Sequence, residues 1–152
     1  MTSFSLKLIA IVTMLCDHAS DALIGHLTWL NIIGRIAFPI FCFQLVIGYG
    51  KTKSVSNYMK RLFIFGLISQ IPFSLFLYAY TGNFMSLNIF FTLLMGICAI
   101  AILDNMKNKW LAILIDIAII ILAEVLNVDY GAWGICLILC IFVFFKRKCE
   151  NK

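Results

Sequence analysis

Long hydrophobic runs alternate with short polar gaps along the whole chain. Six such runs can be distinguished, and they occupy approximately residues 6–24, 31–49, 61–80, 85–104, 109–127 and 131–146. Each is close to the ~20 apolar residues that an α-helix needs to cross a hydrocarbon layer of roughly 30 Å. Because backbone groups in lipid must form their hydrogen bonds within the chain, we expect every run to be helical. The pattern therefore predicts an all-α, polytopic membrane bundle of six transmembrane helices.

The positive charges lie in alternate gaps between these runs. Of the twelve Lys and Arg residues, eleven are found there: Lys7, Lys51, Lys53, Lys60, Arg61, Lys107, Lys109, Lys146, Arg147, Lys148 and Lys152. The other gaps, near residues 25–30, 80–84 and 127–131, contain none. Cytoplasmic loops keep Lys and Arg whereas exported loops do not, so both termini are predicted on the inner side of a bacterial cytoplasmic membrane. Residues 50–58 are then the longest cytoplasmic loop.

Composition supports this topology and excludes other classes of protein. Hydrophobic residues make up 63% of the 152-residue chain and charged residues 12%, and the mean hydropathy is +1.03. Six spans use up this length, so residues 1–152 are predicted to form a single transmembrane domain. The net charge of +5 is assigned to attraction toward anionic lipid headgroups and not to nucleic-acid binding. The lipid bilayer is therefore the first predicted partner.

Six cysteines are spread over the chain, and five of them lie within the predicted spans. Cys136 and Cys140 share a helical face, but neither His nor a carboxylate accompanies them as a zinc site would require. We therefore predict packing roles for the cysteines and no metal site.

Ionisable side chains interrupt the apolar runs at a free-energy cost of about 2.5–3.5 kcal/mol each on insertion scales. They are Asp17, His18 and Asp21 in the first run, Arg35 in the second, and Asp116 and Glu124 in the fifth. Polar amides and hydroxyls join them at Ser69, Gln70, Asn88 and Thr92. With a helical rise of about 1.5 Å per residue, several of these groups lie roughly 16–28 Å from the cytoplasmic cations. We therefore predict an outward-facing pocket, with Asp129 and Tyr130 at its rim.

The first run carries the residues best suited to proton transfer. Asp17, His18 and Asp21 lie within about one helical turn and form one stripe. A carboxylate beside an imidazole favours the imidazolium that a general base becomes. For other polar residues of the runs, helix packing through interhelical hydrogen bonds is a second role: it stays open for Gln70, Asn88 and Glu124, and it is the favoured role for Asp116.

Two prolines are expected to bend the helices that contain them. Pro39 has no N–H for the carbonyl of Arg35, so the second helix should bend just below the arginine. Pro72 has the same effect on the carbonyl of Ile68. Freed carbonyls near polar side chains indicate a wet or ligand-filled cavity, because lipid would not satisfy them.

Five segments of the chain, in the same order, resemble proteins of the TraX family. They are residues 7–18, ending in Asp17-His18; 29–41, with Gly34-Arg35 and Pro39; 61–73, with Ser69-Gln70 and Pro72; 88–93, with Asn88 and Thr92; and 129–134, beginning with Asp129-Tyr130-Gly131. The family takes its name from the membrane enzyme that acetylates the amino terminus of F-pilin. The resemblance covers nearly the whole chain and implies an integral membrane acetyltransferase with acetyl-CoA as co-substrate. Residues 1–152 would then be an acyltransferase-like domain.

TraX proteins are also similar to larger membrane acyltransferases that carry an Arg, ten residues and an essential His in their first span. Lys7 and His18 have this spacing here, with Lys in place of Arg. Lys is a point charge, whereas Arg can grip a phosphate through two parallel hydrogen bonds. The implied reaction moves an acetyl group from cytoplasmic acetyl-CoA to an amine or hydroxyl outside, on a peptide, a sugar or a glycan.

This reaction would divide the polar residues into four roles. His18 would act as the general base, oriented by Asp17 or Asp21. Arg35 or Asn88 would stabilise the tetrahedral oxyanion. The acetyl-CoA binding residues would be Lys7, Lys60, Arg61 and Gln70, and the acceptor-binding residues would be Asp21, Glu124, Asp129 and Tyr130. Direct transfer is preferred over an acetyl-histidine intermediate.

A different class of function stays open beside the enzyme. Substrate-binding subunits of vitamin uptake systems and small transporters are also compact six-helix bundles with outward-facing pockets. They need polar pocket residues but no base near a thioester. A homodimer is a further prediction, for which Gly96 and Ala99 offer a small-residue face.

Overall fold

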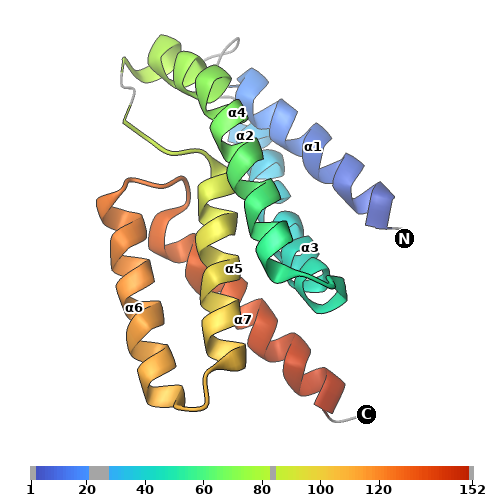
Figure 1. Ribbon diagram of the computed structural model, residues 1–152. Helices are drawn as coiled ribbons and strands as arrows, with labels where there is room; N and C mark the ends of the chain where they lie inside the picture. The colour runs from blue at the N-terminus through green and yellow to red at the C-terminus, as the bar shows by residue number, and fades with distance from the viewer. Residues whose placement is uncertain (1–2, 21–27, 83–84, 151–152) are drawn as a thin grey trace. The chain divides into compact units, whose positions relative to one another are not determined.

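The computed structural model describes residues 3–20, 28–82 and 85–150. These ranges contain seven α-helices: α1 (Ser3–Ala19), α2 (Thr28–Arg35), α3 (Ala37–Lys51), α4 (Val55–Thr81), α5 (Ile89–Asn105), α6 (Lys109–Val125) and α7 (Gly131–Glu150) (Figure 1). In the same ranges, the one β-type contact is an isolated parallel bridge between Leu87 and Val128. The predicted all-α class is therefore confirmed. The chain divides into two compact units, Met1–Gln44 and Leu45–Lys152, which are described separately.

Two apolar segments in the described ranges have the length and composition of membrane spans. Asn31–Lys51 combines most of α2 with α3, and Val55–Ala79 makes up most of α4. Ile89–Asn105, which is α5, is a shorter apolar helix. The 17 residues of α6 rise about 25 Å, slightly less than a typical hydrocarbon layer. The full six-span topology stays a prediction.

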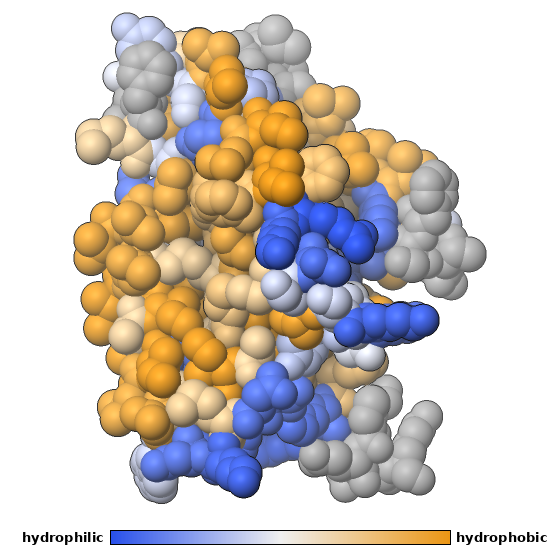
Figure 2. Space-filling view, viewed as in Figure 1, coloured by the Kyte–Doolittle hydropathy of each residue, from blue (hydrophilic) through white to orange (hydrophobic). Residues whose placement is uncertain are grey.

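Large apolar side chains cover the outside of the helices. Leu15 on α1, Ile71 on α4 and Val125 on α6 are 67%, 69% and 75% exposed, respectively. Figure 2 shows a face on which hydrophobic residues extend over α6, while hydrophilic residues gather where α6 begins. Soluble monomers rarely expose large contiguous apolar patches, and lipid is a natural environment for such a surface. These features indicate a membrane protein.

The first unit, Met1–Gln44, packs α1 against α2. α2 ends at Arg35 and α3 begins two residues later, so the helix is interrupted at Ile36. The amide of Ile36 donates to the carbonyl of Ile33 (3.2 Å), which closes a turn. Pro39 has no N–H to offer the carbonyl of Arg35. The bend expected below the arginine is thus confirmed as a break in the helix.

In the second unit, α4 begins earlier than the apolar pattern predicted. Ser54 is its N-cap, and the Ser54 hydroxyl accepts a hydrogen bond from the amide of Asn57 (3.3 Å). This cap satisfies one of the unpaired amides of the first turn, so the helix can begin at Val55. The loop predicted over residues 50–58 is therefore wrong, and only residues 52–54 are non-helical.

Pro72 lies inside α4, and Figure 1 shows that the helix bends before its C-terminal end, as expected.

α5 is the central helix of the second unit, Leu45–Lys152. It packs against α4, α6 and α7 (Figure 1). Gly96 of α5 approaches α7 so closely that an added methyl group would lie 2.4 Å from Cδ1 of Ile138. Gly96 and Ala99 are both buried inside the unit, so they are not available as the predicted dimer face. The homodimer itself stays a prediction.

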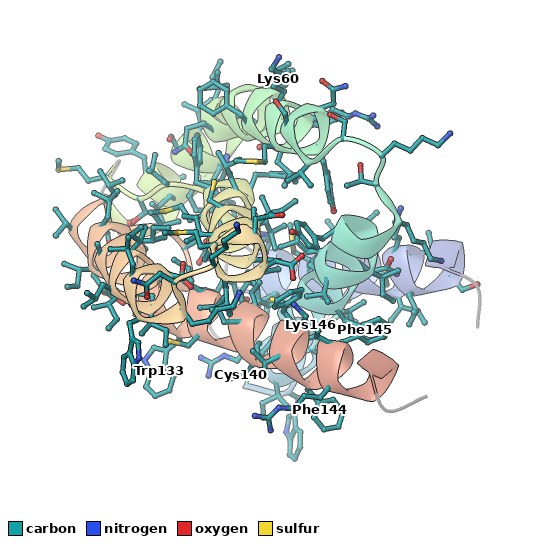
Figure 3. The ribbon with its side chains drawn as sticks, turned by 60° about the horizontal axis from the view of Figure 1, so that its bottom comes forward. Lys60, Trp133, Cys140, Phe144, Phe145 and Lys146 are labelled. Carbon is teal, nitrogen blue, oxygen red and sulfur yellow. The ribbon has the colours of Figure 1, made fainter. Side chains whose placement is uncertain are left out.

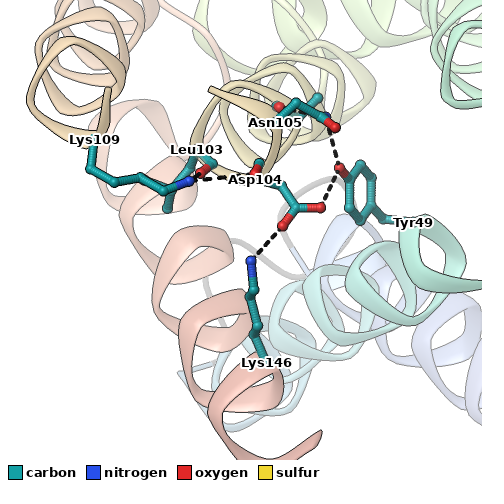
Figure 4. A network of polar contacts seen from close by, with 7 residues as sticks. Tyr49, Leu103, Asp104, Asn105, Lys109 and Lys146 are labelled. Carbon is teal, nitrogen blue, oxygen red and sulfur yellow. Dashed lines mark hydrogen bonds and ion pairs between the residues drawn. The ribbon is translucent and has the colours of Figure 1, made fainter. Parts of the chain in front are cut away.

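A polar network joins α3, α5 and α7 at one end of the second unit (Figure 4). Oδ2 of Asp104 accepts a hydrogen bond from the hydroxyl of Tyr49 (3.0 Å), and Oδ1 pairs with Nζ of Lys146 (2.6 Å). Asn105 also donates to the Tyr49 hydroxyl (3.4 Å), and Nζ of Lys109 donates to the carbonyl of Leu103 (2.6 Å). The network is partly exposed, and the sequence pattern had not singled it out.

Candidate functional site

The polar residues of the first unit form a hydrogen-bonded chain between α1 and α2. Nδ2 of Asn31 donates to Oδ1 of Asp17 (3.0 Å). The hydroxyl of Ser20, which directly follows α1, donates to Oδ1 of Asn31 (2.9 Å). Ser20 is fully buried, and Asn31 and Asp17 are half-buried. These bonds, called the Ser20–Asn31–Asp17 chain below, hold the end of α1 to α2.

Gly34 allows the two helices to approach at Asp17. A methyl group added to Gly34 would lie 2.3 Å from Cβ and 2.6 Å from Cγ of Asp17. These atoms are close to the α1 backbone and cannot move aside as the end of a long side chain could. A residue without a side chain is therefore required on α2 at this point. Asp17, His18, Gly34 and Arg35 are called the α1–α2 crossing below.

His18 and Arg35 directly follow the two residues of this close contact along the chain. His18 follows Asp17 on α1 and is half-buried, whereas Arg35 follows Gly34 at the end of α2 and is exposed. Successive helical residues point about 100° apart, so Asp17 and His18 do not share a direction. Asp17 is turned toward Asn31, and its predicted role in orienting His18 stays a prediction. Asp21, predicted as the third member of the stripe, lies outside the described residues.

In the second unit, Gln70 joins the middle of α4 to the segment that precedes α5. Nε2 of Gln70 donates to the carbonyl of Ser86 (2.9 Å) and to the hydroxyl of Ser74 (3.0 Å). Oε1 of Gln70 accepts from the amide of Asn88 (3.0 Å). The Gln70 amide thus satisfies backbone groups of a non-helical segment, which favours a structural role over the predicted contact with acetyl-CoA.

Asn88 is the N-cap of α5 and is also tied to α4. Oδ1 of Asn88 accepts from the amide of Phe90 (3.0 Å). Nδ2 of Asn88 donates to the carbonyl of Gly66 (2.8 Å) and to the hydroxyl of Ser69 (3.0 Å). The residue is 3% exposed. Both amide hydrogens that an oxyanion would need are therefore engaged, so the geometry supports the alternative of an interhelical hydrogen bond.

The loop between α6 and α7 packs on this same segment. The amide of Leu87 donates to the carbonyl of Asn127 (3.1 Å), and the amide of Asp129 donates to the carbonyl of Leu87 (2.8 Å). The Thr92 hydroxyl donates to the carbonyl of Asp129. Asn127 and Tyr130 have positive φ angles of 50° and 63°, so the loop is tightly turned. Asp129 and Tyr130 belong to this loop, and acceptor binding by them stays a prediction.

The two acidic residues of α6 have different surroundings. Glu124 is exposed, and its Oε1 accepts from the amide of Ala132 (2.7 Å) in the first turn of α7. This bond satisfies one of the unpaired amides at that helix start. Asp116 is 5% exposed, and its Oδ1 has no hydrogen-bond partner among the described residues.

The predicted donor-binding cations lie on the surface. Lys60 and Arg61 are exposed near the start of α4, and Lys60 projects away from the helix in Figure 3. Lys7 is exposed on α1, eleven residues and therefore about 16 Å before His18.

Cys136 and Cys140 also lie on the surface, whereas Cys42 is buried. Trp133 and Phe144 project outward from α7 (Figure 3), on the same face as Cys136 and Cys140. Across the residues that the structure describes, no cluster of His, Cys, Asp or Glu could hold a metal ion.

Sequence reasoning missed Asn31 and Ser20, and it named Gly34 only within the family resemblance. Asn31 lies at the edge of the second apolar run, where an amide carries no obvious cost, and its partner Asp17 is 14 residues away. One available signal was the spacing of Asn31 and Gly34, which places them on one face of a helix.

The fold and the α1–α2 crossing define an all-α membrane protein that keeps ionisable groups between apolar helices. The chain belongs to the TraX family, because the family profile described as "TraX protein" matches residues 3–152. No solved structure is significantly similar to the chain.

Two curated relatives are similar over nearly the whole chain. One is "Probable fimbrial assembly protein FimC, serogroup H1" of Dichelobacter nodosus, 28% identical over 168 residues that cover 99% of this chain and 66% of that protein. The other is "Uncharacterized protein RP591" of Rickettsia prowazekii (strain Madrid E), 31% identical over 152 residues that cover 97% of this chain and 57% of that protein. The chain therefore spans less than two thirds of the length of these relatives.

Proposed function

We propose that the chain is a multi-pass acetyltransferase of the cytoplasmic membrane, which moves an acetyl group from acetyl-CoA to an acceptor outside. The observation that carries this proposal is the α1–α2 crossing, where Asp17 contacts Gly34 and where His18 and Arg35 are the next residues along the two helices. Ionisable groups within apolar helices are costly and usually functional. Membership of the TraX family over residues 3–152 supports transferase chemistry.

In the proposed reaction, His18 takes a proton from the acceptor amine or hydroxyl as its nitrogen or oxygen attacks the thioester carbonyl carbon. Arg35 stabilises the resulting oxyanion, because its guanidinium is always charged. When the oxyanion collapses, the carbon–sulfur bond breaks and the CoA sulfur leaves as a thiolate. His18 then returns the proton to this sulfur, so acetyl transfer needs no acetyl-enzyme.

Exposed Lys and Arg side chains are proposed to bind the acetyl donor. Lys60 and Arg61 are neighbours near the start of α4, and Lys7 is exposed on α1. Guanidinium and ammonium groups form strong charge-assisted hydrogen bonds with phosphate oxygens, and CoA carries several phosphate groups. Acetyl-CoA is therefore the proposed co-substrate, and its phosphates are the proposed partners of Lys60 and Arg61, which belong to one unit.

The acceptor is proposed to be the amino terminus of a pilus or fimbrial subunit. Two observations support a peptide: the family resemblance to the enzyme that acetylates F-pilin, and the relative named as a fimbrial assembly protein. A protonated α-amine is attracted by carboxylates, which Glu124 and Asp129 supply at one end of the second unit, beside Tyr130.

The experiment is acetyl transfer by the purified chain in liposomes, with labelled acetyl-CoA inside and a synthetic peptide with a free α-amine outside. Peptide acetylation is measured by mass spectrometry. His18→Ala is expected to lower kcat by about 10²-fold or more, because general-base catalysis contributes that much. Arg35→Ala should lower kcat more than it raises KM, since it acts in the transition state.

Thr13→Ala is the matched control on the same helix. The Thr13 hydroxyl donates to the carbonyls of Ile9 and Ala10 within α1, so its loss should not change turnover. Undiminished peptide acetylation by His18→Ala would contradict the proposed mechanism.

A further inference from the structure

We infer that Asn31 is a positioning residue that holds the Asp17 carboxylate away from Arg35 and so leaves the guanidinium available for the oxyanion. The inference rests on the acetyl transfer proposed above and extends it to a residue that does not touch the reacting atoms. It follows from three features of the first unit: the orientation of the Asn31 amide, the contact at Gly34, and the partner that Asp17 has taken.

The orientation of the Asn31 amide is set by Ser20. The Ser20 hydroxyl donates to Oδ1 of Asn31 (2.9 Å), which leaves the Nδ2 hydrogens facing Asp17. An ionised carboxylate can only accept hydrogen bonds, so a donor is the correct partner for it. Because Ser20 is 0% exposed, solvent does not compete for its hydroxyl. The amide is thereby kept in the orientation that binds the carboxylate.

Asp17 is constrained at both ends of its side chain. Its Cβ and Cγ lie against Gly34, where an added methyl group would be 2.3 Å and 2.6 Å away. Its Oδ1 is held by Nδ2 of Asn31 at 3.0 Å. The side chain has two rotatable bonds, and these contacts restrain both of them. Asn31 therefore determines where the negative charge of Asp17 lies.

An alternative partner for that charge is Arg35, which lies four residues after Asn31 and therefore on the same face of α2. Arg–carboxylate pairs are among the strongest hydrogen-bonded pairs, and they are often bidentate. Nevertheless, within residues 3–20 and 28–44 Asp17 is bonded to Asn31 and forms no ion pair with Arg35. An Arg35 guanidinium occupied by Asp17 would be withdrawn from the thioester oxygen. The neutral amide of Asn31 prevents this pairing without neutralising either charge.

Asn31→Ala tests the inference in the liposome assay, because it removes the donor and keeps both Asp17 and Arg35. We expect kcat to fall by about 10²-fold, as misplaced catalytic groups commonly cause. The KM for acetyl-CoA should stay within about twofold, because ground-state binding is not affected. Thr13→Ala serves again as the control with a lost hydrogen bond inside α1.

The exchange of both residues, Asp17→Asn with Asn31→Asp, separates positioning from folding. It keeps one donor opposite one acceptor, so the midpoint of thermal unfolding should return to that of the wild type. The carboxylate would now stand four residues before Arg35 on α2, a spacing at which opposite charges pair along a helix. We therefore expect kcat to remain low although stability is restored.

The outcomes distinguish the inference from the proposed function. A low kcat in Asn31→Ala that the exchange does not restore would support positioning. Undiminished kcat in Asn31→Ala, or full recovery of kcat in the exchange, would overturn it while leaving the acetyltransferase intact. If Asn31→Ala does not fold, the exchange decides alone. Absence of acetyl transfer by the wild type would overturn the proposed function, and the role of Asn31 with it.

Discussion

The two units hold their polar side chains in different ways. In the second unit, polar side chains bond mainly to backbone groups, and they are Gln70, Asn88, Thr92, Glu124 and Asn127. In the first unit, Ser20, Asn31 and Asp17 bond to one another. A side chain that satisfies an unpaired backbone group serves the fold, because that group would otherwise be left without a partner. Side chains bonded to each other can instead place charge, so the kind of partner separates a candidate site from a structural network.

The largest effect is expected for Gly34→Ala. Its methyl group would lie 2.3 Å from Cβ of Asp17, so α1 and α2 must separate. Such overpacking lowers the free energy of unfolding by about 1–3 kcal/mol, and misplacing the crossing should reduce kcat by about 10²-fold. Thermal unfolding in detergent and the liposome assay measure the two effects.

Gly50→Ala is the matched control for this variant. Gly50 also lies in a helix, but nothing stands within 4 Å of an added methyl group. Alanine is the better helix former, so stability should stay equal or rise slightly. Equal effects of the two substitutions would show that the close contact at Asp17 has no special role.

The next effect is expected for Asn88→Ala, which should affect stability without affecting chemistry. The substitution removes three hydrogen bonds, to Gly66, Ser69 and Phe90. Each of the two interhelical hydrogen bonds contributes about 0.6 kcal/mol, and the helix cap contributes about 1 kcal/mol. The free energy of unfolding should therefore fall by about 2 kcal/mol. Turnover per folded molecule should be unchanged.

Asn108→Ala provides the comparison, because Asn108 caps α6 through the amides of Trp110 and Leu111. It should cost about 1 kcal/mol, the value of a cap alone. A large loss of kcat in Asn88→Ala with normal thermal stability would instead support the prediction that Asn88 stabilises the oxyanion. The kind of hydrogen-bond partner would then no longer separate catalytic from structural residues in the two units.

Periodicity predicted the helices of this fold better than their ends. The apolar runs correspond to the observed helices, and the break near Arg35 follows from the missing N–H of Pro39, a purely local effect. The start of α5 was placed too early, because the apolar Met85 and Leu87 were counted with the run although Ser86 and Asn88 interrupt it. Asn88 carried the missed signal, since asparagine is a preferred N-cap.

The hydrogen-bond partners within the candidate site could not be predicted in the same way. Asn31 and Asp17 are 14 residues apart and Gln70 and Asn88 are 18 residues apart, and such pairs depend on how helices cross. Periodicity indicates which face of a helix a residue occupies, but it does not say which residue stands opposite. Asp17, Gln70 and Asn88 were therefore identified, whereas Asn31 and the pairing of these side chains were not.

A smaller effect is expected at the Tyr49–Asp104–Lys146 network (Figure 4). It consists of side chains bonded to each other, as in the first unit, but the side chains of Lys146 and Asp104 are 43% and 30% exposed. Partly exposed ion pairs contribute about 0.2–1 kcal/mol. Lys146→Met should therefore reduce the free energy of unfolding by no more than that and leave kcat unchanged. A strong loss of kcat would mean that this end of the unit also takes part in the reaction.

The smallest effect is expected for Asp116→Asn, which tests whether every buried charge in these helices has a function. Asp116 is 5% exposed, and in the described part of the chain its Oδ1 has no hydrogen-bond partner. An amide of nearly the same size is cheaper to bury than an ionised carboxylate. The free energy of unfolding should therefore stay within about 0.5 kcal/mol of the wild type or rise, and kcat should be unchanged. Asp104→Asn, at a partly exposed carboxylate, is the control. A selective loss of kcat in Asp116→Asn would place a reacting group in the second unit, and the contrast between the units would no longer identify the site.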